Sequence, residues 1–166
     1  ENGGKRLDRA QKEELAARKN SYYRELIKTI TPADLLPGIL PLLQRLRAEK
    51  IKIAIASVSH NVWEVVKRLQ IGEYIDLIVD PTRVVKGKPD PEIFMTAAET
   101  VGIPFENCVG VEDAQAGIFA IKDARMFAAG IGKDLKRTDW LLPDTTGLTF
   151  DGLQKNFNAF IDSPRE

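Results

Sequence analysis

The sequence predicts an α/β fold in which a parallel β-sheet lies between layers of helices. Short apolar runs, typical of buried strands, alternate with stretches whose apolar residues recur at helical spacing. Strands that alternate with helices of this length pair in parallel and carry the helices on both faces of the sheet. The length of 166 residues suits one domain, or one domain with a small attachment.

The chain begins with a predicted helix over residues 10–30, in which one stripe is apolar and the other faces are charged. The stripe consists of Leu15, Tyr22, Tyr23, Leu26, Ile27 and Ile30. The segment TPADLLPG (31–38) ends this helix, because it contains two prolines and a glycine. A second helix is predicted by Ile39, Leu42, Leu43 and Leu46, which are spaced by three and four residues.

The strands and helices then alternate to residue 144. Strands are expected at 51–57, 74–80, 108–112, 126–132 and 139–144. Helices are expected at 62–69, 94–101 and 114–124. In an open parallel sheet, ligands bind beyond the carboxyl ends of the strands. The residues that directly follow each strand are therefore the candidates for a functional site.

Composition excludes several classes of partner. Lys plus Arg and Asp plus Glu each number 24, and this balance argues against nonspecific nucleic-acid binding or a polybasic membrane surface. No apolar run reaches the roughly 20 residues that a membrane helix needs, and the polar start does not resemble a signal peptide. A single cysteine, Cys108, cannot form an internal disulfide, which suits a cytoplasmic protein. A thiol within a strand is expected to be inert packing.

The segment after the first strand, SVSHN, comprises Ser57, Val58, Ser59, His60 and Asn61. Hydroxyl groups and free backbone N–H groups at the start of a helix can bind a phosphate. Ser and Asn are also ordinary helix N-caps, so capping is the alternative interpretation of this segment.

The loop after the second strand contains Lys88, within GKPDPEIF. A lysine here could reach a phosphate and neutralise its charge. The alternative is a solvated loop lysine, and Lys86 is open to the same two interpretations.

Two adjacent acids, Glu112 and Asp113, follow the third strand. One carboxylate would be stabilised by the dipole of the next helix, but two exceed what capping needs and repel each other. A divalent cation would offset this repulsion, and Mg²⁺ takes carboxylate, water and phosphate oxygens. A hydroxyl, a lysine and an acid pair at three successive strand ends can converge. That set suits phosphoryl transfer, which depends on positioning and charge neutralisation.

Three segments, ASVS, GKPDPEIF and GVEDAQAGIFAIKDA, resemble in order and spacing motifs two, three and four of the haloacid dehalogenase superfamily. LAARKNSYYRELI, ITPADLLPGI and WLLPDTTGLTFDGL resemble the β-phosphoglucomutases within it. The resemblance implies a three-layer Rossmann-like core, in which Ser57 and Lys88 hold the transferred phosphoryl group and 57–61 lines the phosphate sites. It further implies that Glu112 and Asp113 bind Mg²⁺, Asp113 most directly. Position 60 is His where a Lys is expected; an exposed residue in the first helical turn is its other interpretation.

The activity implied by the resemblance is Mg²⁺-dependent phosphoryl transfer between C1 and C6 of β-glucose phosphate, through an aspartyl-phosphate. The enzyme would be a cytoplasmic monomer whose partner is a small sugar phosphate. A sugar-phosphate phosphatase is the alternative of the same class. A phospho-receiver domain has these residue types in another order, with the acids first and the lysine last. A catalytically inactive binding module is the remaining alternative.

The first motif of this superfamily, an Asp-x-Asp after an apolar strand, does not occur in these 166 residues. The nearest acids, Asp80, Asp134 and Asp144, do not fit that pattern. The resemblance implies that the missing strand lies between 51–57 and 107–111, and that it carries the nucleophile and the general acid–base. We therefore expect a longer protein. Residues 1–30 would be the last helix of a truncated helical cap, and 31–166 a core lacking its first, central strand, inactive by itself.

Overall fold

A computed structural model describes residues 8–163. The helices are α1 (Arg9–Thr29), α2 (Ile39–Ala48), α3 (Val62–Arg68), α4 (Glu92–Val101), α5 (Gln115–Asp123) and α6 (Phe150–Asp162). The strands are β1 (Ala54–Ile55), β2 (Leu77–Ile78), β3 (Val109–Glu112), β4 (Phe127–Ile131) and β5 (Trp140–Leu142). Short 3-10 turns cover Pro32–Asp34, Gly72–Tyr74, Pro81–Arg83, Phe105–Asn107 and Thr145–Gly147.

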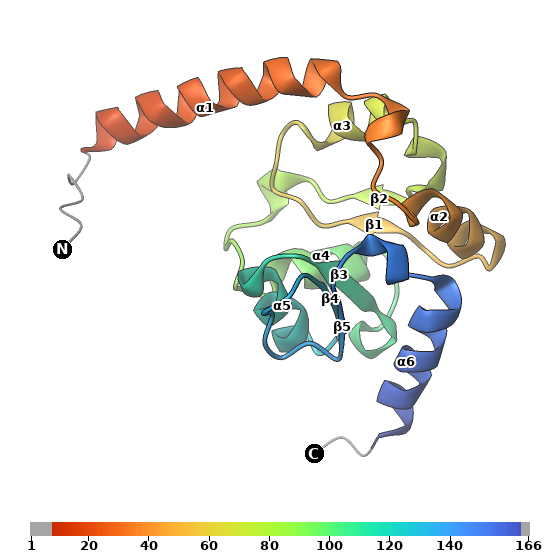
Figure 1. The fold of residues 1–166 in the computed structure, drawn as a ribbon. Coiled ribbons are helices and arrows are strands. Elements are labelled where there is room, and N and C mark those ends of the chain that lie inside the picture. The colour runs from red at the N-terminus through yellow and green to blue at the C-terminus, as the bar shows by residue number, and fades with distance from the viewer. Residues whose placement is uncertain (1–7, 164–166) are drawn as a thin grey trace.

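The strands are all parallel but form two sheets, β1-β2 and β3-β4-β5 (Figure 1). Among the described residues, β1 and β3 therefore pair on one side only, and each has an open edge. The expected strands 51–57 and 74–80 are too long, because only two residues of each are paired. A strand exists only as far as its neighbour continues, and part of 74–80 belongs to a 3-10 turn instead.

One apolar core joins the two sheets. It includes Val79 after β2, Ile93 of α4, Ile118 of α5 and Ala128 of β4, none more than 2% exposed. Helix α4 contacts both strands of the first sheet as well as α5. Burial of this apolar surface, at roughly 25 cal/mol per Å², is what holds the two sheets together.

Helices α2 and α6 contribute to a second apolar cluster, in which Phe127 of β4 is central. The rings of Phe157 and Phe160 lie edge-on to Phe127, with centroids 5.9 and 5.4 Å away. Helix α6 was not predicted, although Leu153, Phe157 and Phe160 have helical spacing. Thr149 marks its start, since its hydroxyl accepts the Gly152 N–H at 3.1 Å.

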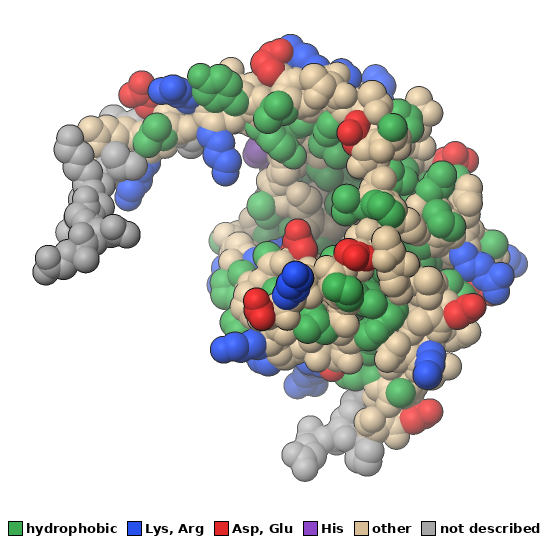
Figure 2. Space-filling model, in the orientation of Figure 1, with side chains coloured by type: hydrophobic (Ala, Val, Ile, Leu, Met, Phe, Trp, Pro, Cys, Tyr) green, Lys and Arg blue, Asp and Glu red, His purple; other side chains and the backbone are tan. Residues whose placement is uncertain are grey.

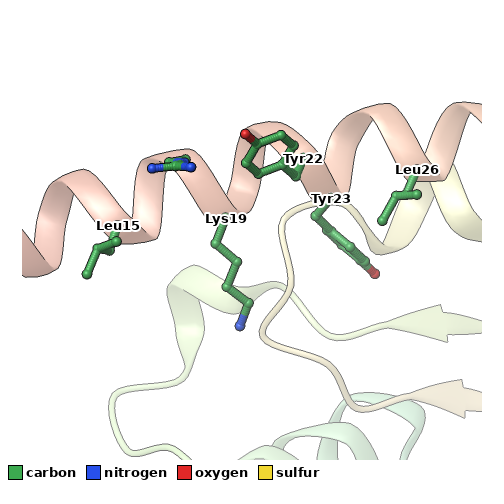
Figure 3. A pocket seen from close by; sticks show the side chains of 6 residues that line it. Leu15, Lys19, Tyr22, Tyr23 and Leu26 are labelled. Carbon is green, nitrogen blue, oxygen red and sulfur yellow. The ribbon is translucent and has the colours of Figure 1, made fainter. Parts of the chain in front are cut away.

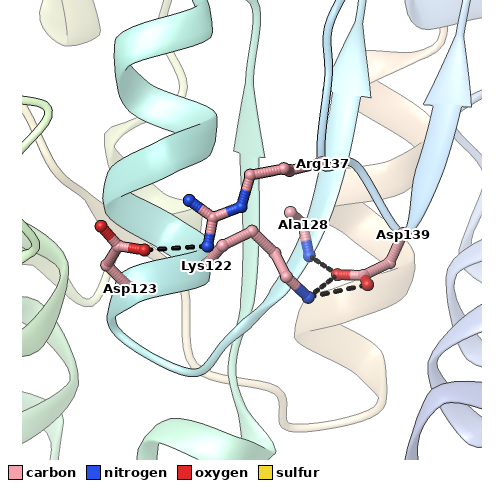
Figure 4. A network of polar contacts seen from close by, with 5 residues as sticks. All are labelled: Lys122, Asp123, Ala128, Arg137 and Asp139. Atoms are coloured by element: carbon pink, nitrogen blue, oxygen red, sulfur yellow. Dashed lines mark hydrogen bonds and ion pairs between the residues drawn. The ribbon is translucent and has the colours of Figure 1, made fainter.

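The connection from β4 to β5 is an irregular loop held by ion pairs (Figure 4). The Asp139 carboxylate accepts hydrogen bonds from Lys122 Nζ and the Ala128 N–H, both at 2.7 Å. Arg137 donates to Asp123 at 3.0 Å. These contacts tie α5 to β4 and β5, so they fix the position of the helix that follows the acid pair.

Helix α1 projects beyond the body of the molecule (Figure 1). Of its apolar stripe, Ile27 is buried, whereas Leu15, Tyr22, Tyr23 and Leu26 are exposed. Figure 2 shows hydrophobic side chains along this helix and open space beneath it. No helix in the described part of the chain is long and apolar enough to span a membrane.

Candidate functional site

The ends of β2 and β3 meet through one contact. Lys88 Nζ, from the loop after β2, lies 2.6 Å from Glu112 Oε2 at the end of β3. Because β1 runs parallel to β2, with Ile55 opposite Ile78, its carboxyl end lies at the same edge. The loops after all three strands therefore share one side of the molecule, as the sequence predicted.

The structure separates the two candidate lysines. The Lys88 side chain is 29% exposed, and its ammonium lies 4.8 Å from the centroid of the Phe94 ring. The Lys86 side chain is 71% exposed, and among the described residues its ammonium has one ion pair, at 3.5 Å to Asp90. Lys88 is therefore held at the strand ends, whereas Lys86 is the solvated loop lysine.

Glu112 is fixed from three sides. Its Oε1 accepts the backbone N–H groups of Asp113 and Ala114, each at 3.2 Å, while Oε2 accepts from Lys88. Its carboxylate also lies against Gly117 of α5, where a Cβ would be 2.2 Å from Oε2. Lys88 thus supplies the positive charge that offsets Glu112, so repulsion within the acid pair does not by itself require a metal.

Asp113 is exposed, and its carboxylate accepts no hydrogen bond from the described residues. The described part of the chain holds no cluster of three or more His, Cys, Asp or Glu side chains that could bind a metal. Mg²⁺ commonly uses one or two carboxylates and completes its octahedron with water and substrate phosphate. The two adjacent carboxylates fit this mode of binding, with Asp113 open and Glu112 held beside it.

No side chain of the segment Ser57–Asn61 makes a capping hydrogen bond to α3. Asn61 is the N-cap residue and its side chain accepts no capping hydrogen bond. Instead, the Ser57 hydroxyl accepts the Ser59 N–H at 3.2 Å, and the Ser59 hydroxyl accepts the Asn61 N–H at 3.3 Å. Neither the Val58 nor the His60 N–H donates to an acceptor within the described residues. These donors, with two hydroxyl protons, are available to an anion.

One side chain of this loop contacts helix α1. Asn61 Nδ2 donates to Asn20 Oδ1 at 3.1 Å, and Arg68 of α3 donates to the Lys28 carbonyl at 2.5 Å. His60 is exposed. These two hydrogen bonds thus couple the orientation of α1 to the loop whose N–H and hydroxyl groups are the candidates for binding a phosphate.

The remaining acids have structural surroundings. Asp80 and Asp144 each accept the N–H and the hydroxyl of the threonine two residues later, at the start of a 3-10 turn. The pKa of Asp80 is lowered mainly by the hydrogen bond from the Thr82 N–H and secondly by the hydrogen bond from the Thr82 hydroxyl. Asp134 is an exposed loop residue. Cys108 packs against the core, and burial raises the pKa of its thiol.

Sequence reasoning missed two side chains that shape this site. Glu92, at the start of α4, accepts two backbone N–H groups of the loop before Lys88. Gln115, at the start of α5, exchanges two hydrogen bonds with the Lys136 backbone, at 2.8 and 3.0 Å. Both act on backbone groups, and such contacts leave no spacing signal in a sequence.

Helix α1 has a groove of about 470 Å³ on its own surface (Figure 3). Its lining consists of Leu15, Arg18, Lys19, Tyr22, Tyr23 and Leu26. Figure 3 shows the Lys19 and Tyr23 side chains directed from α1 toward the body. All six residues come from one helix, so this groove belongs to the exposed face of α1 rather than to the strand ends.

Comparison with known proteins identifies close relatives. The chain is 45% identical over 153 residues to the β-phosphoglucomutase of Bacillus subtilis strain 168, covering 91% of this chain and 68% of that protein. A phosphorylated carbohydrates phosphatase of Thermotoga maritima is 33% identical over 90 residues, which are 53% of this chain and 42% of that one. The crystal structure of β-phosphoglucomutase from Clostridium difficile superposes with a TM-score of 0.89 at 38% identity, covering 95% of this chain and 71% of that one.

The fold, the strand-end residues and these relatives agree on one family. Residues 2–125 match the sequence profile of the haloacid dehalogenase-like hydrolases. Sugar-phosphate enzymes of that family include both a mutase and a phosphatase among the relatives above. The chain therefore belongs to the haloacid dehalogenase-like hydrolase family, and its fold is the Rossmann-like α/β fold of that family.

Proposed function

We propose that the protein is a Mg²⁺-dependent β-phosphoglucomutase, which converts β-glucose 1-phosphate to glucose 6-phosphate. The observation that carries this proposal is the Lys88–Glu112 ion pair at 2.6 Å, at the sheet edge where the Ser57 loop leaves β1. A fixed ammonium at the same sheet edge as N–H and hydroxyl donors that have no acceptor among the described residues suits a phosphoryl group, because charge neutralisation and positioning dominate phosphoryl transfer. The 45% identity to the Bacillus subtilis mutase supports this choice of reaction.

Each residue has a role in the proposal. Ser57 and Lys88 hold the phosphoryl group that is transferred, the serine through its hydroxyl proton and the lysine through its charge. Backbone N–H groups of Val58 and His60, with the side chains of Ser59, His60 and Asn61, line the phosphate sites. Glu112 keeps Lys88 in place until substrate oxygens share its ammonium.

Asp113 would be the main protein ligand of Mg²⁺, with Glu112 beside it. When bound, the ion supplies charge compensation to the phosphoryl oxygens. The open carboxylate of Asp113 and the water and phosphate ligands that Mg²⁺ retains support this assignment.

The nucleophilic aspartate and the general acid–base would lie on a sixth strand, between β1 and β3. The open edges of these two strands support this proposal, because an unpaired strand edge presents backbone N–H and C=O groups with which another strand can pair. Residues 31–166 would then form the core that lacks this central strand, and residues 1–30 would belong to a helical cap. The exposed apolar face of α1 supports the cap, because amphipathic helices bury that face against neighbours. We propose that the full-length protein, with this strand and cap, acts as a cytoplasmic monomer.

A sugar-phosphate phosphatase is the second candidate, and the Thermotoga maritima relative favours it. The two activities differ in whether a sugar hydroxyl or water accepts the phosphoryl group from the aspartate. The full-length protein should therefore be given β-glucose 1-phosphate, and glucose 6-phosphate and inorganic phosphate measured together. Glucose 6-phosphate as the main product supports the mutase; stoichiometric phosphate release with no glucose 6-phosphate would show a phosphatase.

A further inference from the structure

The part of the loop directly before Lys88, after Val84 packs against the core, has little packing of its own. Val85 is 90% exposed, and the Lys86 side chain is 71% exposed. A loop with few apolar contacts fluctuates unless polar contacts hold it. Lys88 nevertheless points at Glu112 with its ammonium 2.6 Å away, so something else must fix the backbone that precedes it.

The contact that fixes it comes from Glu92, the first residue of α4. Its Oε1 accepts the Val85 N–H at 2.8 Å, and its Oε2 accepts the Lys86 N–H at 2.7 Å. Hydrogen bonds to an ionised carboxylate are stronger than those between neutral groups. Both oxygens are used, so the carboxylate fixes the direction as well as the position of the loop.

Helix α4 is a rigid support for this contact. Ile93 and Phe94, which follow Glu92, are 1% and 8% exposed, within the core that joins the two sheets. The Phe94 ring lies 4.8 Å from Lys88 Nζ, so it supports the lysine from the same helix turn. Because both residues belong to a helix anchored in the core, Glu92 holds the loop backbone in a fixed position and Phe94 supports the Lys88 ammonium.

We propose that Glu92 is a positioning residue for Lys88: its carboxylate clamps the N–H groups of Val85 and Lys86 and so keeps the ammonium at the phosphoryl site. The kinetic consequence rests on the proposed phosphoryl transfer, whereas the clamp itself does not. Glu92 acts only through Lys88. Its loss should lower kcat much more than it changes KM, since in the proposed function Lys88 acts on the phosphoryl group that is transferred.

The test compares E92A and E92Q with E99Q in the full-length protein. Glu99 is an exposed acid on the same helix with no side-chain hydrogen bond or ion pair among the described residues, which makes it a matched control. E92A should lower kcat about 10-fold, E92Q less because its amide oxygen keeps one acceptor, and E99Q should not change it. In a K88A background, E92A should cause no further loss, as expected of residues that act as a unit.

Two results would overturn the proposal. One is an equal loss from E92A with and without Lys88, which would mean a general structural effect. The other is unchanged amide hydrogen exchange at Val85 and Lys86 in E92A, since loss of the clamp should make both amides exchange faster. The exchange measurement needs no activity, so it decides the clamp even if the full-length protein transfers no phosphoryl group and the proposed function fails.

Discussion

Gly117 of α5 lies directly against the carboxylate of Glu112, and a Cβ at this position would come within 2.2 Å of Oε2. The glycine is thus required by close approach and not by its backbone angles. It lets the helix after the acid pair begin beside the side chain that holds Lys88.

The G117A variant should therefore displace Glu112 and separate it from Lys88. Overpacking of this kind costs about 1–3 kcal/mol, so we expect a lower free energy of unfolding, measured by urea denaturation, together with reduced activity. G72A is the control, because a Cβ there would meet only Val66 Cγ1 at an ordinary 3.8 Å. Equal stability of the two variants would contradict the close contact.

Replacing Lys88 by methionine should lower kcat of the full-length protein about 100-fold, because a fixed cation at the transferred group is lost. K86M should have activity close to that of the wild-type protein, since the ammonium of Lys86 is solvated and its side chain contributes little. A comparison of kcat for the two variants decides between the lysines. A larger loss from K86M would reverse their assignment.

The difference between these lysines could not be predicted from the sequence, although the elements around them could. Apolar runs predicted β3 and β4 to within about one residue, because each strand coincides with a short run composed mainly of apolar residues and glycine. The length of β1 depends on its neighbours, which a local pattern does not contain. Which lysine is held depends on Phe94, which lies in the following helix, and on Glu112, which lies at the end of a different strand.

Removing Mg²⁺ with a chelator should abolish activity, and adding it back should restore activity. D113N should raise the Mg²⁺ concentration needed for half-maximal activity about 10-fold or more, because its open carboxylate is the proposed main ligand. Isothermal titration of Mg²⁺ into wild-type and D113N protein would give the same comparison without turnover. An unchanged Mg²⁺ requirement in D113N would reject Asp113 as the ligand.

Asp76 should make stability depend on pH in the acid range. The pKa of Asp76 is lowered from 3.8 to about 2. The largest cause is the hydrogen bond from the Ile53 N–H, and the second is the hydrogen bond from the Lys52 ammonium. A lowered pKa means that the carboxylate stabilises the fold above about pH 3.8, and that this contribution is lost as the pH falls toward 2. D76N should be less stable than the wild-type protein at pH 7 by about 1 kcal/mol, given that the cations are half exposed.

Urea unfolding of wild-type and D76N protein between pH 7 and pH 3 would measure this difference. It should shrink as the pH falls below 3.8, the ordinary pKa of the group. D134N is the control, because Asp134 is exposed and has no ion pair among the described residues. A difference between D76N and the wild-type protein that does not change with pH would contradict the lowered pKa.

The proposed sixth strand makes a prediction about β3. The Phe127 N–H bonds to the Cys108 carbonyl, so the alternation of a parallel ladder turns the N–H groups of Val109 and Val111 toward the open edge. Both valines are exposed, at 36% and 44%.

In the 166-residue chain these two amides should exchange with solvent quickly. In the full-length protein they should exchange at least about 100-fold more slowly, because the added strand accepts them and closes the sheet. The amides of Gly110 and Glu112, which face β4, should be protected in both proteins and serve as the internal reference. Fast exchange of Val109 and Val111 in the full-length protein would mean that no strand lies between β1 and β3, and the nucleophile would then have to be sought elsewhere.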